Sequence, residues 1–501
     1  MILALFSLHN FPFFKNTTNM KLYKMLGKNI EKIKKCISSD DVIFHELTVK
    51  NKKACLVFAG DIVDKNAIGE LVLRPLENTK GKLTEKTLLS TFYSPEKQIV
   101  EEADDIVREI VNGNTVLLVD GFAKAISFGL KKFEKRAIAE PPTSTVIKGP
   151  REGFVESLPV NISMMRRKLK TPDLRFENIT VGKFSSTVVS ICYVHGIADL
   201  SLVEKIRNKL KKIDIDAILD SSYISKFLGE HRRSIFKQVG NTEKPDILAA
   251  KILEGRVAIF VDGSPIALTV PYLLIEDFQS PSDYYASSYS ATISRLIRTI
   301  SVTLSLFLPS FFVASELFHL QFIPFAFLLT IENSIKGIPL SPSSEMFFTL
   351  MIFEILNEAS VRMPRYVGMV VSIVGGLVLG ETAVSAGIIS APTLMIVAFS
   401  GICLYTVPEL VQTFSVLRFL SLLVAGTLGI YGLISLTIIF LTYLVSFESY
   451  STPICAPFSP LITKDLKDSV YKGFFIEHEL RPISLTNFNK RRMKTSKKEA
   501  K

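Results

Sequence analysis

The stretch "DIVREIVNGNTVLLVDG" (Asp105–Gly121) decides the fold of the first half of this 501-residue chain. It reads as a helix, a glycine, an apolar strand and then Val-Asp-Gly. An Asp-Gly pair between two strand-like runs predicts a β-hairpin. The same order recurs in "ILAAKILEGRVAIFVDG" (Ile247–Gly263), with the same spacing between the two glycines.

Upstream of each copy lies a second matching pair. "ACLVFAGDIVD" (Ala54–Asp64) and "SICYVHGIAD" (Ser190–Asp199) both indicate a buried strand, a glycine and an acidic helix start. The sequence therefore predicts two similar, duplicated α/β subdomains, over roughly 40–135 and 175–270. Asp120 and Asp262 could form a carboxylate pair, but aspartate in an Asp-Gly pair is typical of a turn, and we interpret both as turn residues.

The second half of the chain has the composition of membrane-spanning helices. Between Tyr366 and Phe447 the only charged side chains are Glu381, Glu409 and Arg418, and Thr299–Ser315 has none. A helix needs about 20 mostly apolar residues to cross the hydrocarbon of a bilayer. We expect an all-α transmembrane half with four spans, at about 299–318, 366–389, 393–411 and 419–446. Six crossings remain an alternative if 320–332 and 346–362 both cross.

The cations behind the net charge of +11 collect in three places, which are the run Arg166–Lys170, the pair Arg295 and Arg298, and the tail. Arg295 and Arg298 precede the first span, and Lys464–Lys501 contains 11 Lys or Arg against 5 Asp or Glu. Cations beside the spans follow the positive-inside rule and can bind anionic lipid headgroups. We therefore expect both ends of the membrane half to lie in the cytosol. We expect no nucleic-acid partner, because the sequence has no zinc-ligand set, helix-turn-helix spacing or stacking motif.

Motifs of catalysis and metal binding are missing from the sequence. We find no GxGxxG, Walker loop, HExxH or GxSxG, and the five cysteines form no CxxC pair. These gaps favour a binding or assembly role over an enzyme, with no metal and no cofactor. A membrane-tethered enzyme and a transporter binding its own solute remain alternatives. The more ordinary start codon is Met20, so 1–19 is interpreted as an upstream extension or a mis-assigned start.

A stiff, basic connector separates the two predicted subdomains. Proline and glycine pairs turn it, and "NISMMRRKLK" (Asn161–Lys170) reads as a helix with a cationic end. Such a segment suits docking of another subunit or a membrane surface; a plain linker is the alternative. The docking candidates are Lys148, Arg151, Glu152, Arg166, Arg167 and Lys168.

One helix predicted in the second half, over 344–363, carries charges on a single face. Glu354, Glu358 and Arg362 are spaced i, i+4 and i+8, and Glu358 precedes Arg362 in the favoured ion-pair order. Charges at membrane depth face a partner, a cavity or a pore. The alternative is an interfacial helix with its polar face among the headgroups. The pore or gating candidates are Glu354, Asn357, Glu358, Val361, Arg362 and Ser372.

Three segments resemble the A subunit of the GerA-type spore germinant receptors. They are "EPPTSTVIKGPREGFVESLPVNISMMRRKLKTPDL" (140–174), "FQSPSDYY" (278–285) and "FEILNEASVRMPR…VSIVGGLVLGETAVSAGIIS" (353–390). The chain departs from the family at Lys148, where the family usually has Arg, and at Ser144, where Glu is common. The connector residues of the family motif are Gly149, Pro150, Gly153, Phe154, Pro281, Asp283, Tyr284 and Tyr285.

The resemblance implies a multi-pass protein of the spore inner membrane that converts nutrient sensing into ion release. It implies a transporter-like B subunit, a lipoprotein C subunit and self-association into an ion-conducting oligomer. The paralogue associated with the stage V sporulation A proteins is an alternative. The expected organisation is an extension with a basic helix (1–39), the first subdomain (40–135), the connector (136–174), the second subdomain (175–270), a juxtamembrane connector (271–298), the transmembrane domain (299–447) and a basic cytosolic tail (448–501).

Overall fold

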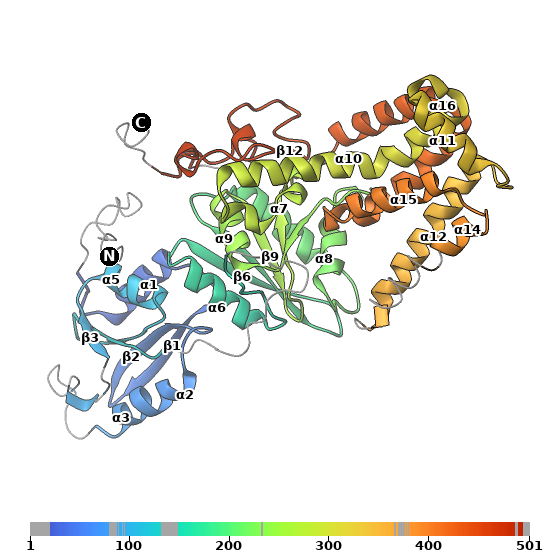
Figure 1. Ribbon diagram of the computed structural model, residues 1–501. Coiled ribbons are helices and arrows are strands. Elements are labelled where there is room, and N and C mark those ends of the chain that lie inside the picture. Colours follow the sequence, from blue (N-terminus) through green and yellow to red (C-terminus); the bar gives the residue numbers. More distant parts are fainter. Residues whose placement is uncertain are drawn as a thin grey trace, which may run out of the picture.

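The computed structural model has two α/β units, a helical half and a tail that returns to the second unit (Figure 1). In Figure 1 the first unit is blue, the second is green, and the helical half runs from yellow to orange at the right. This order confirms an α/β first part followed by a helical part. The structure describes residues 21–79, 88, 90–92, 94, 96–131, 149–231, 234–364, 367–368, 376, 378, 380–485 and 489–493.

The first unit is a five-stranded antiparallel sheet with the strand order β1-β2-β4-β5-β3 and helices on both faces. Residues of β4 are buried on both faces because α1 and α5 pack on one side and α2 and α3 on the other. A sheet covered on both faces needs such continuous apolar strands. The elements are α1 (Leu26–Cys36), β1 (Val42–Val49), β2 (Lys52–Ala59), α2 (Lys65–Ile68), α3 (Arg74–Glu77), β3 (Lys97–Val100), α5 (Ala103–Val111), β4 (Thr115–Val119) and β5 (Ala125–Phe128).

The second unit has the corresponding strand order β6-β7-β9-β10-β8, again antiparallel. Helices α6 and α9 cover one face and α7 and α8 the other. The helix α6, which the sequence placed in the connector, packs against this sheet. The elements are α6 (Leu158–Lys168), β6 (Leu174–Val181), β7 (Thr187–Val194), α7 (Leu200–Lys211), α8 (Ser221–Leu228), β8 (Gly240–Thr242), α9 (Pro245–Leu253), β9 (Val257–Val261) and β10 (Ala267–Val270).

The two Asp-Gly turns make the same contact in both units. The carboxylate of Asp120 accepts a hydrogen bond from the backbone N–H of Leu26 at 2.9 Å, and that of Asp262 accepts one from Leu158 at 3.1 Å. Each aspartate therefore satisfies an amide at the first turn of the helix that opens its unit. They lie in separate sheets, and the structure supports their interpretation as turn residues.

The helical half begins with one long helix that emerges beside the second unit. Two helical segments, 288–318 and 408–445, are long and apolar enough to cross a membrane. Helix α15 is apolar but shorter, and α12 carries the predicted charged face. The helices are α10 (Ser288–Phe318), α11 (Phe325–Ile335), α12 (Pro342–Arg362), α14 (Gly380–Ser385), α15 (Ala391–Leu404) and α16 (Val411–Val445).

Helix α16 is a hairpin, because the chain reverses at Gly429. This residue has a φ of 61° and a ψ of −150°, both non-helical. Thr413 donates a hydrogen bond to the carbonyl of Ile235 at 2.9 Å, while the ring of Phe440 lies 5.6 Å from that of Phe236. In a straight helix Thr413 and Phe440 would be about 40 Å apart. The prediction of one uninterrupted span over 419–446 is therefore wrong, because the positive φ of Gly429 turns the chain back.

Replacing Gly429 with alanine should lower the amount of protein in the membrane fraction several-fold. At this φ and ψ, which essentially only glycine adopts, a Cβ costs about 1–3 kcal/mol, and here it would lie 3.0 Å from the Phe318 ring. Quantitative immunoblotting of membrane fractions measures the effect. The matched control is Gly27→Ala, at a helical glycine with nothing within 4 Å of the added atom. Equal levels of the two variants would show that the turn tolerates a side chain.

The tail lies on the second unit instead of extending freely from the helices (Figure 1). Tyr450 joins the apolar core between the sheet and helices α7 and α8, and its hydroxyl donates to the carbonyl of Leu228 at 2.9 Å. Further along, Arg481 donates to the carbonyl of Leu253 at 2.6 Å, at the end of α9. Much of the described tail is thus committed to contacts within the chain.

Candidate functional site

The start of α10 is held by a carboxylate that binds two arginines. Asp283 accepts hydrogen bonds from Nη1 of Arg298 at 2.7 Å, from Nη2 of Arg298 at 2.8 Å and from Nε of Arg295 at 3.2 Å. Arg295 is fully buried and Asp283 nearly so. Buried charges need such pairing, because a lone ion loses its hydration without compensation.

The sequence "SPSDYY" places this carboxylate. Pro281 opens a short 3-10 turn, Pro281–Tyr284, in which the backbone N–H of Ser280 donates to Asp283 at 3.0 Å and the N–H of Asp283 donates back to the carbonyl of Ser280. Proline suits this first position because its φ is already fixed. The turn holds Asp283 five residues before the start of α10, where its carboxylate reaches Arg295 and Arg298.

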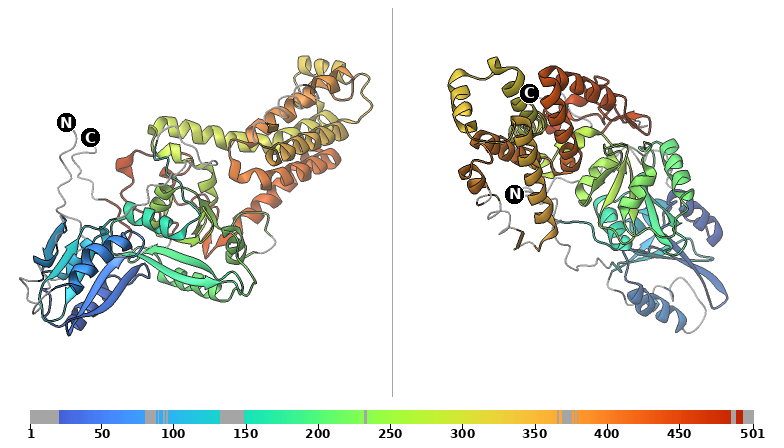
Figure 2. Two further views of the ribbon diagram at one scale, coloured as in Figure 1. Left: turned by 90° about the horizontal axis from the view of Figure 1, so that it is seen from below. Right: turned by 90° about the vertical axis from the view of Figure 1, so that its right-hand side faces the viewer.

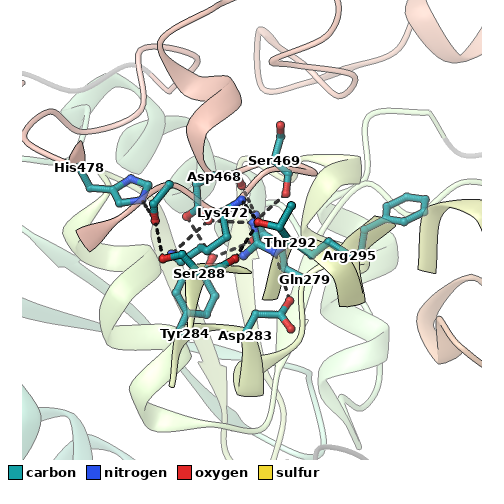
Figure 3. A network of polar contacts seen from close by, with 12 residues as sticks. Gln279, Asp283, Tyr284, Ser288, Thr292, Arg295, Asp468, Ser469, Lys472 and His478 are labelled. Atoms are coloured by element: carbon teal, nitrogen blue, oxygen red, sulfur yellow. Dashed lines mark hydrogen bonds and ion pairs between the residues drawn. The ribbon is translucent and has the colours of Figure 1, made fainter. Parts of the chain in front are cut away.

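The tail completes the cluster from the other side (Figure 3). Asp468 accepts from Nη1 of Arg295 at 3.0 Å and from the hydroxyl of Tyr284 at 3.2 Å, and Lys472 lies 3.4 Å from it. The same Nη1 also donates to the carbonyl of Ser469 at 2.7 Å. We call these residues the polar joint; its members are Asp283, Tyr284, Arg295, Arg298, Asp468 and Lys472.

The protonation of the polar joint follows from burial and from its own charges. Burial would raise the pKa of Asp283, but the hydrogen bonds from Arg298 and from the Ser280 amide, with the charges of both arginines, lower it. Burial lowers the pKa of Lys472 against the opposing charge of Asp468. Asp283 is therefore ionised at neutral pH, and its contribution to stability is lost only when the pH falls through its lowered pKa.

The two connector motifs meet beside the polar joint. Gly149 has a φ of 122°, and a side chain there would lie 2.6 Å from the ring of Tyr285. The hydroxyl of Tyr285 donates to Asp246 at 2.5 Å, and the carbonyl of Pro150 accepts from the buried Nζ of Lys244 at 3.0 Å. Segments more than a hundred residues apart in sequence thus lie together at the start of α9.

The same connector enters the core of the second unit. Gly153 and Phe154 are buried, and the Phe154 ring meets Phe260 edge-on at 5.3 Å. Asn161 bonds both the N–H and the carbonyl of Val155 with its side-chain amide. The motif residues of this segment therefore hold the second unit together and fix where its first helix begins.

The structure corrects the prediction that Arg166 is a surface docking residue. Its side chain is 2% exposed and lies between the two units. It donates to both carboxylate oxygens of Asp41, at 2.7 and 2.8 Å, and to the hydroxyl of Ser39 at 3.1 Å. Its guanidinium also lies over the ring of Phe176, 5.1 Å from its centroid. The cationic run suggested an exposed face, but Asp41, 125 residues away in sequence, makes burial possible.

The other docking candidates lie nearer the surface. Arg167 and Lys168 both pair with Glu152, at 2.7 and 3.2 Å, and Arg151 is exposed. Lys148 lies outside the described residues. Docking of another subunit at this face remains a prediction that no longer includes Arg166. It applies to Lys148, Arg151, Glu152, Arg167 and Lys168.

Of the pore candidates, the structure separates Glu354 from Glu358 and Arg362. The last two form the predicted ion pair at 2.5 Å on an exposed face, with 64% and 77% of their side chains exposed. Glu354 points to the neighbouring helix and accepts from the hydroxyl of Ser415 at 3.0 Å. Asn357 is partly buried in α12. Val361 lies in α12, but its side chain is outside the described part of the structure. Ser372 lies outside the described residues altogether.

Sequence reasoning missed two parts of this site. Asp468 gave no signal, because its partners are nearly two hundred residues away. Arg418 did give one: it is the only cation between Tyr366 and Phe447, and an isolated charge in an apolar stretch indicates a buried partner. The polar joint links the turn Pro281–Tyr284, the start of α10 and the tail through hydrogen bonds and ion pairs. Within the described residues, no group of His, Cys, Asp and Glu could hold a metal ion.

Comparison with known proteins gives consistent matches along the chain. Residues 28–484 match the family described as Bacillus/Clostridium GerA spore germination protein. Spore germination protein KA of Bacillus subtilis is 36% identical over 93% of this chain and 87% of its own length. Spore germination protein GerLA of Bacillus cereus is 32% identical over 86% of this chain and 89% of its own.

A solved structure, the N-terminal domain of the A subunit of the Bacillus megaterium spore germinant receptor GerK3, is 29% identical with a TM-score of 0.39. It corresponds to 52% of this chain and to 99% of that domain. The family match covers nearly the whole described chain, including the polar joint and α12. This chain belongs to the GerA family of spore germination proteins.

Proposed function

We propose that the chain is the A subunit of a nutrient-germinant receptor in the spore inner membrane. In this proposal it acts with a transporter-like B subunit that recognises the nutrient and with a lipoprotein C subunit. The A subunit converts that recognition into ion release as a symmetric, ion-conducting oligomer. The α/β units and the tail lie in the cytosol, and the two units descend from one duplicated ancestor.

One observation carries this proposal: α10 runs without interruption from the polar joint into the helical half (Figure 2). Its 31 residues are about 46 Å long. Its base is fixed to both the connector and the tail through Arg295. A displacement of the second unit is therefore transmitted to the packed helices α12, α15 and α16.

The charged helix α12 supplies the ion path in this proposal. In a symmetric oligomer each copy contributes one α12, so its carboxylates form rings, and acidic rings attract cations into a pore of low dielectric constant. The alternative of a transporter that binds its own solute predicts saturable solute binding to the purified protein.

The proposal is tested in spores that lack this chain and in spores in which it is restored. A mixture of amino acids, sugars and nucleosides is added, and potassium in the medium is followed with an ion-selective electrode. We expect release only when the chain is present. Equal release from both kinds of spore would contradict the proposal, provided that the other germinant receptors of the strain have been deleted.

Replacing Glu354 with glutamine should reduce nutrient-triggered potassium release about tenfold when the release is divided by the amount of protein. The substitution keeps the size and one hydrogen-bonding oxygen but removes the charge that draws cations to the path. Electrode recordings and immunoblots of the same spores measure both quantities. Glu70→Gln is the matched control, because that carboxylate forms an exposed pair with Arg74 in the first unit. Wild-type release from the Glu354 variant would instead favour an interfacial role for α12.

A further inference from the structure

Arg418 is a buried cation at the centre of the helical half. It lies in the first arm of α16, about 10 Å from the start of that helix, and 1% of its side chain is exposed. Its Nη2 donates to the hydroxyl of Ser400 in α15 at 2.8 Å. Its Nη1 lies 3.5 Å from Glu354 Oε1 in α12. One guanidinium thus links three helices.

The carboxylate of Glu354 is bound on one side only by the described residues. Both contacts, from Arg418 and from the hydroxyl of Ser415 at 3.0 Å, are made to Oε1. Its side chain is still 21% exposed. Arg418 and Ser415 come from the same arm of α16, so this arm determines where the carboxylate lies at the surface of the helices.

The pair Glu358–Arg362 makes no comparable link. Both residues belong to α12, are mostly exposed and bond only to each other among the described residues. An exposed i, i+4 pair contributes little to the stability of the helix. Breaking a buried pair leaves an unpaired charge and costs far more. Of the two pairs, the one between Glu354 and Arg418 is therefore the one that joins different helices through a buried side chain.

We infer that Arg418 is the positioning residue for Glu354 and thereby sets the preference of the ion path for cations. This inference rests on the proposed ion conduction. Arginine suits the role because its planar fork reaches Ser400 and Glu354 at the same time, which the single ammonium group of a lysine does not reproduce. Without the guanidinium, the carboxylate loses both its place and its counter-charge, and the ring of carboxylates loses its geometry.

The test uses the complete receptor complex, reconstituted in planar bilayers with a potassium chloride gradient. The reversal potential after addition of the same nutrient mixture gives the ratio of cation to anion permeability. The variants are Arg418→Gln, Glu354→Gln, the double variant Arg418→Gln/Glu354→Gln, and Arg418→Lys. The control is Arg74→Gln, which removes a cation from the exposed pair with Glu70 in the first unit.

We expect Arg418→Gln and Glu354→Gln to lower the permeability ratio by a similar factor, about tenfold, because the first leaves the carboxylate of Glu354 without its positioning partner and the second removes the charge of that carboxylate. The double variant should be no worse than either single variant, because both act through one carboxylate. Arg418→Lys should restore the protein level and part of the ratio. Arg74→Gln should behave as wild type.

Three results separate the possible failures. A wild-type complex that conducts no ions contradicts the proposed function itself. A conducting complex in which Arg418→Lys and Arg418→Gln keep the wild-type ratio overturns the role of Arg418. Additive losses in the double variant also overturn it, because two independent sites would then act on the ion path. If Arg418→Gln is not recovered in membranes, the lysine variant alone decides between these outcomes.

Discussion

Replacing Arg166 with glutamate should remove about 3–5 kcal/mol from the free energy of unfolding, the cost of breaking a buried ion pair. The new carboxylate would face Asp41, and the hydroxyl of Ser39 would lose its donor. Domains of this kind are stable by about 5–15 kcal/mol in total. We therefore expect the purified full-length variant in detergent to unfold at a much lower urea concentration, followed by far-ultraviolet circular dichroism.

Arg167→Glu is the matched control, because it changes the neighbouring charge on the same helix. Arg167 is 35% exposed and pairs with Glu152 at the surface, where an ion pair contributes about 0–1 kcal/mol. The double variant Asp41→Leu/Arg166→Met should recover much of the loss, since two apolar side chains leave no buried charge. Equal destabilisation by the two glutamate variants would mean that Arg166 is solvated in solution.

The second large effect is expected at Arg295. Its replacement by glutamine should reduce nutrient-triggered ion release by about tenfold or more, in line with coupling free energies of about 1–3 kcal/mol between sites. The variant loses the charged contacts to Asp283 and Asp468, so the tail is no longer tied to α10 through this side chain. Release of potassium from spores after nutrient addition measures the coupling, and an immunoblot measures the amount of protein.

Asp468→Asn separates coupling from folding at the same place. It keeps an acceptor oxygen for Arg295 and leaves Arg298 bound to Asp283, so the protein should accumulate normally while ion release falls. Lys183→Gln serves as the control, because its pair with Asp214 is 62% and 73% exposed on the second unit. Normal release from Asp468→Asn, together with normal release from Arg295→Gln, would show that the polar joint has no part in coupling.

The local patterns of the sequence predicted the α/β units well. The helix-glycine-strand-Asp-Gly order describes α5 to β5 and α9 to β10, because capping and turn formation depend on neighbouring residues. The bounds of the units were predicted less well. α6 was assigned to a connector because its cationic end looked solvated, and its partner Asp41 is visible only in three dimensions.

The helical half shows a second limit of sequence reasoning. Composition identifies apolar segments but does not show where a chain turns inside one, and the reversal at Gly429 has no charged residue beside it to mark it. The candidate site shows the same difference between local contacts, which the sequence predicts, and contacts between helices, which it does not. The i, i+4 spacing predicted the pair Glu358–Arg362, which is local. The partners of Glu354 lie on α16, and only the packing of the helices brings them together.

The return of the tail to the second unit sets the order of events during synthesis. Tyr450 fills the core next to Leu228, and Asp468 binds Arg295, but both are translated after every helix of the helical half. While the chain is still on the ribosome, the second unit therefore has an incomplete core, and Arg295 at the base of α10 has Asp283 but not yet Asp468 as a partner. Only a completed chain can close these contacts, so a truncated product keeps exposed apolar surface that quality-control proteases recognise.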